Sequence, residues 1–242
     1  MKKILISACL IMALSGCQSI DSPEKAAQDS KKTSLKRIAD NVRKSGDVQA
    51  AAQLEARIIE MDKHDPQAFI DLADNVKSYG SKADVLDILQ EGEKANPDSP
   101  ELKIALAKNY LEDNYPEKAL KKLEEIKGDK SRDYYNFKGV ALDLIGEYKN
   151  AQNTYKEGLK ENQRDSLLLN NMALSMLLTH DYKQAISILE ELADRNNGGK
   201  YLHNLALAYG MNGDTEKARK ILGRELTPEE IEENLRIYKE LR

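Results

Sequence analysis

The chain has 242 residues, of which 32% are charged and 40% hydrophobic, which is typical neither of a membrane-spanning bundle nor of a disordered chain. Aromatic residues make up only 5%, Trp is absent, and Gly and Pro are scarce, which argues against a β-sandwich or a β-barrel. A formal net charge of −4 argues against a broad nucleic-acid interface. The composition therefore favours long, charged, amphipathic helices.

Residues 1–16 are predicted to be a secretory signal peptide. Met1-Lys2-Lys3 is basic, and the apolar run over residues 4–13 is too short to span a bilayer, which requires about twenty residues. The run ends in Leu14-Ser15-Gly16-Cys17, which resembles a lipobox, the site at which bacterial lipoproteins are lipidated on the cysteine and cleaved before it. The alternative is an ordinary cleaved signal in which Cys17 is incidental.

Cysteine usage agrees with lipidation at Cys17. Cys9 is the other cysteine and would leave with the signal, so the mature protein would have no free thiol and no disulfide. Acyl chains such as palmitate would anchor the protein, at about 0.8 kcal/mol for each buried methylene. By resemblance to bacterial lipoproteins, Gln18 after the cysteine implies the outer membrane. Residues 17–31 are polar and without periodicity, and they are predicted to form a lipidated flexible tether.

Residues 32–242 repeat with a period close to 34 residues, and three registers of residues carry the repeat. The first predicted helix of each pair has a small side chain at Ala39, Ala73, Ala107, Gly139, Ala173 and Ala206. Twelve residues later, the second helix has a short side chain at Ala51, Val85, Ala119, Ala151, Ala185 and Ala218. Between the two lies a residue that tolerates the left-handed conformation with which helices end: Gly46, Gly80, Asn114, Gly146, His180 or Gly213. The period is that of tetratricopeptide repeats, and it predicts an all-α solenoid of about six helix pairs.

A solitary helix is predicted over residues 228–242. Thr227-Pro228-Glu229-Glu230 is a capping box with proline at the first helical position, and Ile231, Leu235 and Tyr238 follow as one apolar stripe. One interpretation is a cap over the open end of the helix stack, which such stacks require. The other is a helix folded back towards the groove of the stack. We favour the cap.

The sequence contains no arrangement of residues that predicts catalysis or metal binding. His64, His180 and His203 lie in three different repeats, and the mature chain offers no cysteine to help them bind a metal. The zincin, serine-hydrolase and phosphate-loop motifs are absent from the sequence. The 41 carboxylates are spread along helix faces beside Lys and Arg, which is typical of solvated surfaces. We therefore expect no enzyme, no cofactor and no small-molecule substrate.

Helix stacks of this kind bind partners on a concave surface, which the first helix of each pair lines. One residue after the small residue of repeats four to six, the side chains are apolar: Val140, Leu174 and Leu207. Polar side chains, mostly amides, lie nearby on the same helices: Asn136, Asn170, Asn171, His203 and Asn204. The predicted site is an apolar strip beside this row of amides, suited to a peptide segment and ending at Lys108 of repeat three. The alternative is that these side chains only pack one repeat against the next.

The second half of the chain also resembles a particular family. Residues 139–159, 170–192, 204–214 and 226–242, together with the lipobox, are similar to the tight-adherence (Flp) pilus assembly lipoproteins, the TadD-like family. The closing pattern of Asn234, Leu235 and Tyr238 after a capped helix is more telling than the repeat motif itself. The resemblance implies an outer-membrane lipoprotein that faces the periplasm, takes part in assembling type IV-like Flp pili and pilots the secretin channel. Only Cys17 carries over as a functional position.

The leading hypothesis is a lipid-anchored helical adaptor whose partner is a secretin or another protein of a pilus or secretion machine. The lipid on Cys17 would bring the protein to the membrane, and the groove would hold a short segment of the channel subunit. The runner-up is a periplasmic adaptor that recruits peptidoglycan hydrolases, proteases or envelope-assembly factors to the outer membrane. A periplasmic enzyme is the third hypothesis, and nucleic acid is not an expected partner.

Overall fold

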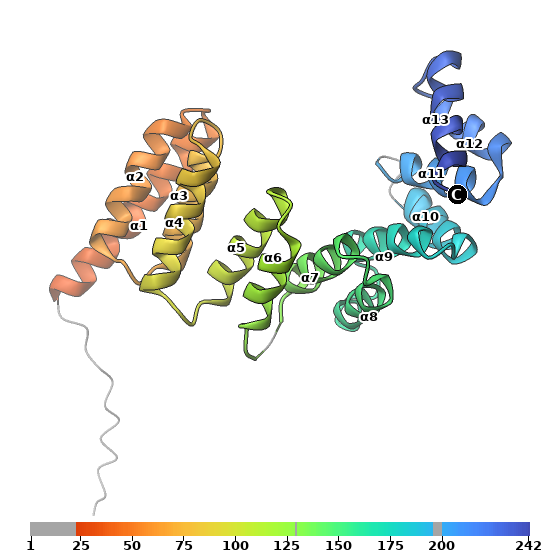
Figure 1. Ribbon diagram of the computed structural model, residues 1–242. Helices are drawn as coiled ribbons and strands as arrows, with labels where there is room; N and C mark the ends of the chain where they lie inside the picture. The colour runs from red at the N-terminus through yellow and green to blue at the C-terminus, as the bar shows by residue number, and fades with distance from the viewer. Residues whose placement is uncertain (1–22, 129, 196–199) are drawn as a thin grey trace, which may run out of the picture.

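The computed structural model describes residues 23–128, 130–195 and 200–242, and these residues fold into thirteen α-helices without a strand. The helices follow one another along an extended, curved stack, with α1 at one end and α13 at the other (Figure 1). The helices are α1 (Pro23–Lys44), α2 (Val48–Met61), α3 (Pro66–Val76), α4 (Lys82–Ala95), α5 (Pro100–Glu112), α6 (Pro116–Glu124), α7 (Arg132–Leu144), α8 (Tyr148–Gly158), α9 (Ser166–Leu178), α10 (Tyr182–Arg195), α11 (Tyr201–Asn212), α12 (Thr215–Leu222) and α13 (Pro228–Glu240). The predicted signal peptide and Cys17 lie outside the described residues.

The described helices form six pairs followed by one single helix. Each helix contacts the next along the chain, and from α3 onward each odd-numbered helix also contacts the following odd-numbered helix. The odd-numbered helices are therefore the first helices of successive repeats, and α13 continues their row. The all-α solenoid predicted from the period of the sequence is confirmed.

Small residues let the paired helices approach closely. All twelve residues of the two registers of short side chains are buried, from Ala39 and Ala51 in the first pair to Ala206 and Ala218 in the sixth. At Gly139, a Cβ atom would lie 2.2 Å from Cε1 of Tyr155, a ring that is itself completely buried. The glycine is therefore required by the close approach of α7 and α8.

The turn within a helix pair is left-handed in five of the six pairs. Gly46, Gly146 and Gly213 have φ angles of 91°, 81° and 94°, and Asn114 and His180 have φ angles of 61° and 59°. Glycine carries no steric penalty in this region, and Asn and His are among the residues that tolerate it. The predicted role of these five turn residues is confirmed.

Gly80 is the exception, and the prediction of a left-handed turn there is wrong, since it is absent from the residues with positive φ. The loop between α3 and α4 spans residues 77–81 and is longer than the two- or three-residue loops within the other pairs. The longer loop reverses the chain without a left-handed residue. Glycine is nevertheless favoured, because a Cβ atom there would lie 2.5 Å from Cγ1 of Val76.

The first helix begins earlier than predicted. Helix α1 begins at Pro23, so residues 23–31, which we expected to belong to a flexible tether, are helical. The following turn is held by ion pairs: Nζ of Lys32 lies 2.5 Å from Oδ2 of Asp62 and 2.9 Å from Oδ2 of Asp65, next to the end of α2. Such contacts join residues that are distant in sequence, so they are not recorded as a pattern of apolar residues in the sequence of the helix. Within residues 23–31, Nε2 of Gln28 likewise donates to the carbonyl of Met61 at 3.3 Å, so the boundary at residue 31 was placed too late.

Helix α13 lies at the end of the stack. Its predicted capping box is confirmed, because the hydroxyl of Thr227 accepts a hydrogen bond from the N–H of Glu230, and the Glu230 carboxylate accepts one from the N–H of Thr227. Ile231, Leu235 and Tyr238 are buried, and the helix contacts α11 and α12. This is the geometry of a cap. Across the described residues, we find no helix with the length and apolar character that crossing a membrane requires.

Candidate functional site

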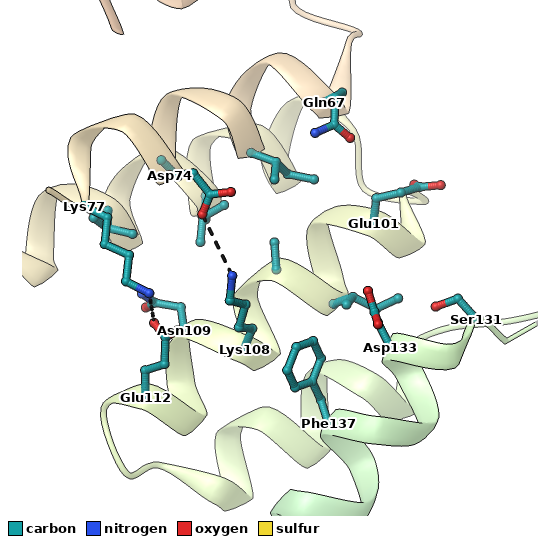
Figure 2. A pocket seen from close by; sticks show the side chains of 16 residues that line it. Gln67, Asp74, Lys77, Glu101, Lys108, Asn109, Glu112, Ser131, Asp133 and Phe137 are labelled. Carbon is teal, nitrogen blue, oxygen red and sulfur yellow. Dashed lines mark hydrogen bonds and ion pairs between the residues drawn. The ribbon is translucent and has the colours of Figure 1, made fainter. Parts of the chain in front are cut away.

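A groove of 420 Å³ runs across α3, α5 and α7, the first helices of repeats two, three and four. Figure 2 shows its side chains converging from these helices, and we call it the α3–α5–α7 groove. It is lined by Gln67, Ile70, Ala73, Asp74, Lys77, Val85, Leu89, Glu101, Ile104, Ala105, Lys108, Asn109, Glu112, Ser131, Asp133 and Phe137. Because first helices line the concave side of such stacks, this is the strongest candidate for a binding surface.

The floor of the groove is apolar. Ile70 of α3, Ile104 of α5 and Phe137 of α7 are half-buried, so each exposes part of an apolar side chain to the groove. Val85 and Leu89 of α4 are buried behind them. Covering such a surface with a partner's apolar side chains is favourable by about 25 cal/mol for each Å² removed from water.

The rim of the groove carries charges that partly pair across it. Nζ of Lys77 lies 2.5 Å from Oε2 of Glu112, and Nζ of Lys108 lies 4.0 Å from Oδ1 of Asp74. Both pairs join α3 to α5. Figure 2 shows Lys77 and Glu112 at the end of the groove away from Glu101 and Asp133, and Asp74 and Lys108 between the two ends. All four side chains are substantially exposed, so each pair contributes at most about 1 kcal/mol.

Two further carboxylates lie at the other end of the groove. Glu101 and Asp133 belong to the first turns of α5 and α7, and Figure 2 shows them near Ser131. Glu101 accepts a hydrogen bond from the hydroxyl of Ser99 at 2.7 Å, and Asp133 pairs with Arg132 at 2.9 Å. Within the described chain, Glu101 has no ion-pair partner, so this end of the groove carries one unpaired carboxylate.

Asn109 of α5 also lines the groove, and its Oδ1 atom has no hydrogen-bond partner among the described residues. The residue is only 8% exposed, and this oxygen is fully buried. An unpaired buried amide oxygen lowers the stability of the fold by about 1–3 kcal/mol.

The amides predicted as a binding row are brought together, but they bond to one another. Nδ2 of Asn171 donates to Oδ1 of Asn136 at 2.8 Å, and Nδ2 of Asn204 donates to Oδ1 of Asn170 at 2.7 Å. Asn170 and Asn171 are linked at 3.2 Å, which completes a chain of amides from α7 through α9 to α11. The chain joins three repeats, so its geometry favours the packing interpretation. Its role in binding stays a prediction.

The remaining predicted site residues lie outside the groove as well. Leu174 and Leu207 are half-buried and pack against the core of repeats four to six. Val140 is half-buried on α7. His203 is exposed and faces Glu225, with Nε2 3.0 Å from the carboxylate. Of the predicted apolar strip, Leu174 and Leu207 thus pack within the core that connects repeats four to six.

The position of the groove differs from the one expected. We placed the site in repeats four to six and ended it at Lys108, but Lys108 is part of the groove, which covers repeats two to four. The signal was present in the sequence: Ile70 and Ile104 lie three residues before the small residues of their helices, the register in which we noted Asn136. What the sequence does not show is where successive helices leave a concavity.

A second polar network, which we did not predict, joins repeats four and five. The hydroxyl of Tyr155 donates to Oδ2 of Asp143 at 2.9 Å, and the hydroxyl of Ser175 donates to Oδ1 of the same carboxylate at 2.5 Å. Burial raises the pKa of Asp143, and the two hydrogen bonds act against that rise. These groups are inside the stack and lie apart from the groove, so they serve packing.

Glu55 of α2 is the most deeply buried carboxylate of the described chain, at 1% exposure, and neither of its oxygens has a hydrogen-bond partner there. Burial raises its pKa to about 7, and the negative charge of Asp71 adds to the effect. It is not among the residues that line the α3–α5–α7 groove. Across residues 23–128, 130–195 and 200–242, no cluster of three or more His, Cys, Asp or Glu residues could hold a metal ion.

Comparison with solved structures identifies the architecture. PilF from Pseudomonas aeruginosa aligns with a TM-score of 0.72 at 14% identity, over 88% of this chain and 100% of that one. The fold is a tetratricopeptide-repeat α-solenoid. A tetratricopeptide-repeat protein of Thermus thermophilus aligns with a TM-score of 0.60 at 17% identity, covering 73% of this chain and 98% of that one. YrrB, described as a tetratricopeptide-repeat protein with an unusual peptide-binding site, gives 0.54 at 15% identity, over 78% and 94%.

At the level of sequence, no protein-family model matches the chain, and no curated protein matches it significantly. The identities to the solved structures are low, so they establish the fold of the tetratricopeptide-repeat solenoid and nothing finer. Helix stacks of this type present an extended concave surface.

Proposed function

We propose that this tetratricopeptide-repeat protein is an adaptor that holds a segment of a partner protein in the α3–α5–α7 groove. The observation that carries the proposal is the groove itself, with an apolar floor of Ile70, Ile104 and Phe137 and a charged rim. An apolar surface with a few polar groups around it is the usual composition of a site that binds a peptide segment. The similarity in fold to YrrB supports a peptide as the ligand.

The adaptor is proposed to be anchored in the outer membrane through lipid on Cys17, facing the periplasm. Support comes from the lipobox of the sequence and from the early start of α1 at Pro23. Five residues separate Cys17 from Pro23. The greatest possible distance between these two residues is therefore about 20 Å. The anchor would thus keep the solenoid close to the membrane surface, nearer than the tether of residues 17–31 would have done.

The partner is proposed to be the secretin of a pilus assembly machine, whose delivery to the outer membrane this protein would assist. The resemblance to the TadD-like lipoproteins supports this assignment, and the likeness to PilF supports the architecture. The alternative partners are peptidoglycan hydrolases, proteases or envelope-assembly factors. Neighbouring genes for a secretin, an assembly ATPase and a prepilin would favour the pilus.

Membrane fractionation of cells tests the proposal. The full-length protein is compared with Cys17→Ser, which removes the lipid, and with Ile104→Glu, which places a charge on the floor of the groove. Leu144→Glu is the matched control, because Leu144 is an exposed apolar residue of α7 outside the groove. Secretin multimers should fail to reach the outer membrane with the first two variants and should reach it with the control.

Two results would contradict the proposal at different points. If secretin multimers reach the outer membrane in cells without this protein, the piloting role is wrong. If the Ile104→Glu protein is folded by circular dichroism and still supports assembly, the groove is not the binding site. Cross-linking from Phe137, with a photoreactive residue in its place, then identifies whichever protein occupies the groove.

A further inference from the structure

The charges of the α3–α5–α7 groove do not balance. Four carboxylates line it, on Asp74, Glu101, Glu112 and Asp133, against the two ammonium groups of Lys77 and Lys108. Each lysine already has a carboxylate opposite it, at 2.5 Å for Lys77 and 4.0 Å for Lys108. Arg132 pairs with Asp133 at 2.9 Å, so Glu101 is the lining carboxylate without an ion pair in the described chain, and the groove has a surplus of one negative charge before any ligand binds.

The surplus is concentrated at one end. Glu101 and Asp133 lie on the side of the groove formed by the first turns of α5 and α7, and Figure 2 shows both lysines away from them. The apolar side chains of Ile104 and Phe137 lie on these same two helices. A ligand that covers the apolar floor would thus come within reach of the two carboxylates.

We infer that the segment bound in the α3–α5–α7 groove is a basic, apolar peptide, whose apolar side chains cover Ile70, Ile104 and Phe137 and whose Lys or Arg reaches Glu101 and Asp133. The inference rests on the proposed function and adds the chemistry of the ligand to it. Contacting helices lie about 8–10 Å apart, so an extended segment of about six residues crosses the three helices.

The competing explanation is that Glu101 and Asp133 only stabilise their own helices. Both are in first turns, where a carboxylate interacts favourably with the positive end of the helix dipole. Glu117 of α6 and Glu229 of α13 are first-turn carboxylates too, and they lie outside the groove. Neutralising these two residues provides a control that matches the loss of helix stabilisation.

Fluorescence anisotropy with the purified full-length protein in detergent tests the inference. The probes are two synthetic peptides of about ten residues, one alternating Leu with Lys and the other alternating Leu with Glu. The Lys peptide should bind at least about tenfold more tightly than the Glu peptide, and the difference should shrink as salt is raised from about 20 to about 200 mM. The Glu101→Gln/Asp133→Asn variant should bind the Lys peptide about five- to tenfold more weakly than the wild type does. The Glu117→Gln/Glu229→Gln variant should leave its affinity unchanged.

The outcomes separate this inference from the proposed function. If both peptides bind equally and Ile104→Glu abolishes both, the groove is a binding site and the charge preference is wrong. Tighter binding of the Glu peptide, no binding of the Lys peptide, or equal effects of the two double variants also overturns the preference. If Ile104→Glu changes neither peptide binding nor secretin assembly, the proposed function fails together with the inference.

Discussion

The two halves of the solenoid differ in whether their buried polar side chains have hydrogen-bond partners. In repeats four to six they bond to half-buried polar side chains, as Asn136 does with Asn171 and Ser175 with Asp143. In repeats one to three, buried side-chain atoms without a hydrogen-bond partner in the described chain occur on Glu55, Asn75 and Asn109. Paired buried groups rigidify a fold, whereas unpaired ones reduce its stability. The N-terminal half, which supplies α3 and α5 to the groove, is therefore expected to be the less stable half.

The hydrophobic cores differ in the same direction. One continuous core extends from Leu142 to Tyr238 through the C-terminal half, whereas the N-terminal half has two smaller cores. In a solenoid each repeat is stabilised by its neighbours, so a continuous core couples repeats four to six more strongly. The comparison suggests a rigid C-terminal support and an N-terminal binding region that tolerates local opening.

The largest expected effect is that of enlarging a core glycine of the C-terminal half. Gly139→Val should reduce the free energy of unfolding by about 3 kcal/mol, because even a Cβ atom would lie 2.2 Å from the buried ring of Tyr155. Gly92→Val is the matched change in the N-terminal half, where the nearest atom would be Cβ of Phe69 at 2.8 Å. Urea unfolding followed by circular dichroism should show the smaller loss for Gly92→Val. Equal losses would contradict the difference in rigidity.

The next effect is a dependence of stability on pH that originates in repeat one. The pKa of Glu55 is about 7 in the folded protein and about 4.5 in a model compound. The folded state therefore binds more protons between these values, and stability should fall as pH rises through this range and level off above it. The total change is about 3 kcal/mol. The charged groups that influence Glu55 are Asp71 of α3 and Lys36, Asp40 and Arg43 of α1.

Thermal unfolding of Glu55→Gln should show the loss of this dependence. The variant should be more stable than the wild type at about pH 8 and no more stable at about pH 4. Asp71→Asn serves as a second test, because it removes the nearby negative charge and should lower the pKa of Glu55. A wild-type profile that is flat between pH 4 and about 7 would show that Glu55 is not buried in this way.

Removing one polar group should change the free energy of unfolding in opposite directions in the two halves. Ser175→Ala should cost about 1–2 kcal/mol, because it deletes a 2.5 Å hydrogen bond between the buried hydroxyl of Ser175 and the half-buried carboxylate of Asp143. Asn75→Leu should stabilise the protein by about 1 kcal/mol, because neither end of the Asn75 amide has a partner in the described chain and the residue is 2% exposed. Denaturant unfolding measures both. Destabilisation by Asn75→Leu would remove the contrast between the halves.

The parts of the fold that the sequence predicted are those in which side-chain size acts directly. A small residue at Ala107 or Gly139 is needed wherever two helices approach closely, so the registers are visible in the sequence. The start of α1 was missed because Gln28 contacts Met61 across 33 residues, and no local pattern in the sequence records such a contact. Gly80 was misjudged because its role follows from loop length.

The site was predicted only in part for a similar reason. The position of Asn136 and Asn171 on facing helices follows from the repeat, but the choice between bonding a partner and bonding each other depends on distances. The groove depends on how much space α3, α5 and α7 leave between their exposed faces, and residue types alone do not determine that space. Fold and register are thus recoverable from this sequence, whereas the position of the concavity requires coordinates.

The smallest expected effect concerns the amide chain itself. A double-mutant cycle with Asn136→Ala, Asn171→Ala and both should give a coupling free energy of about 0.5–1.5 kcal/mol, because the two amides share a 2.8 Å hydrogen bond. The same cycle on Asn150 and Glu147, an exposed pair on α8 and its N-cap that are also joined at 2.8 Å, should give less coupling. If instead Asn171→Ala leaves stability unchanged and weakens partner binding, the amides act on a ligand. The C-terminal half would then be a second binding surface rather than the support of the first.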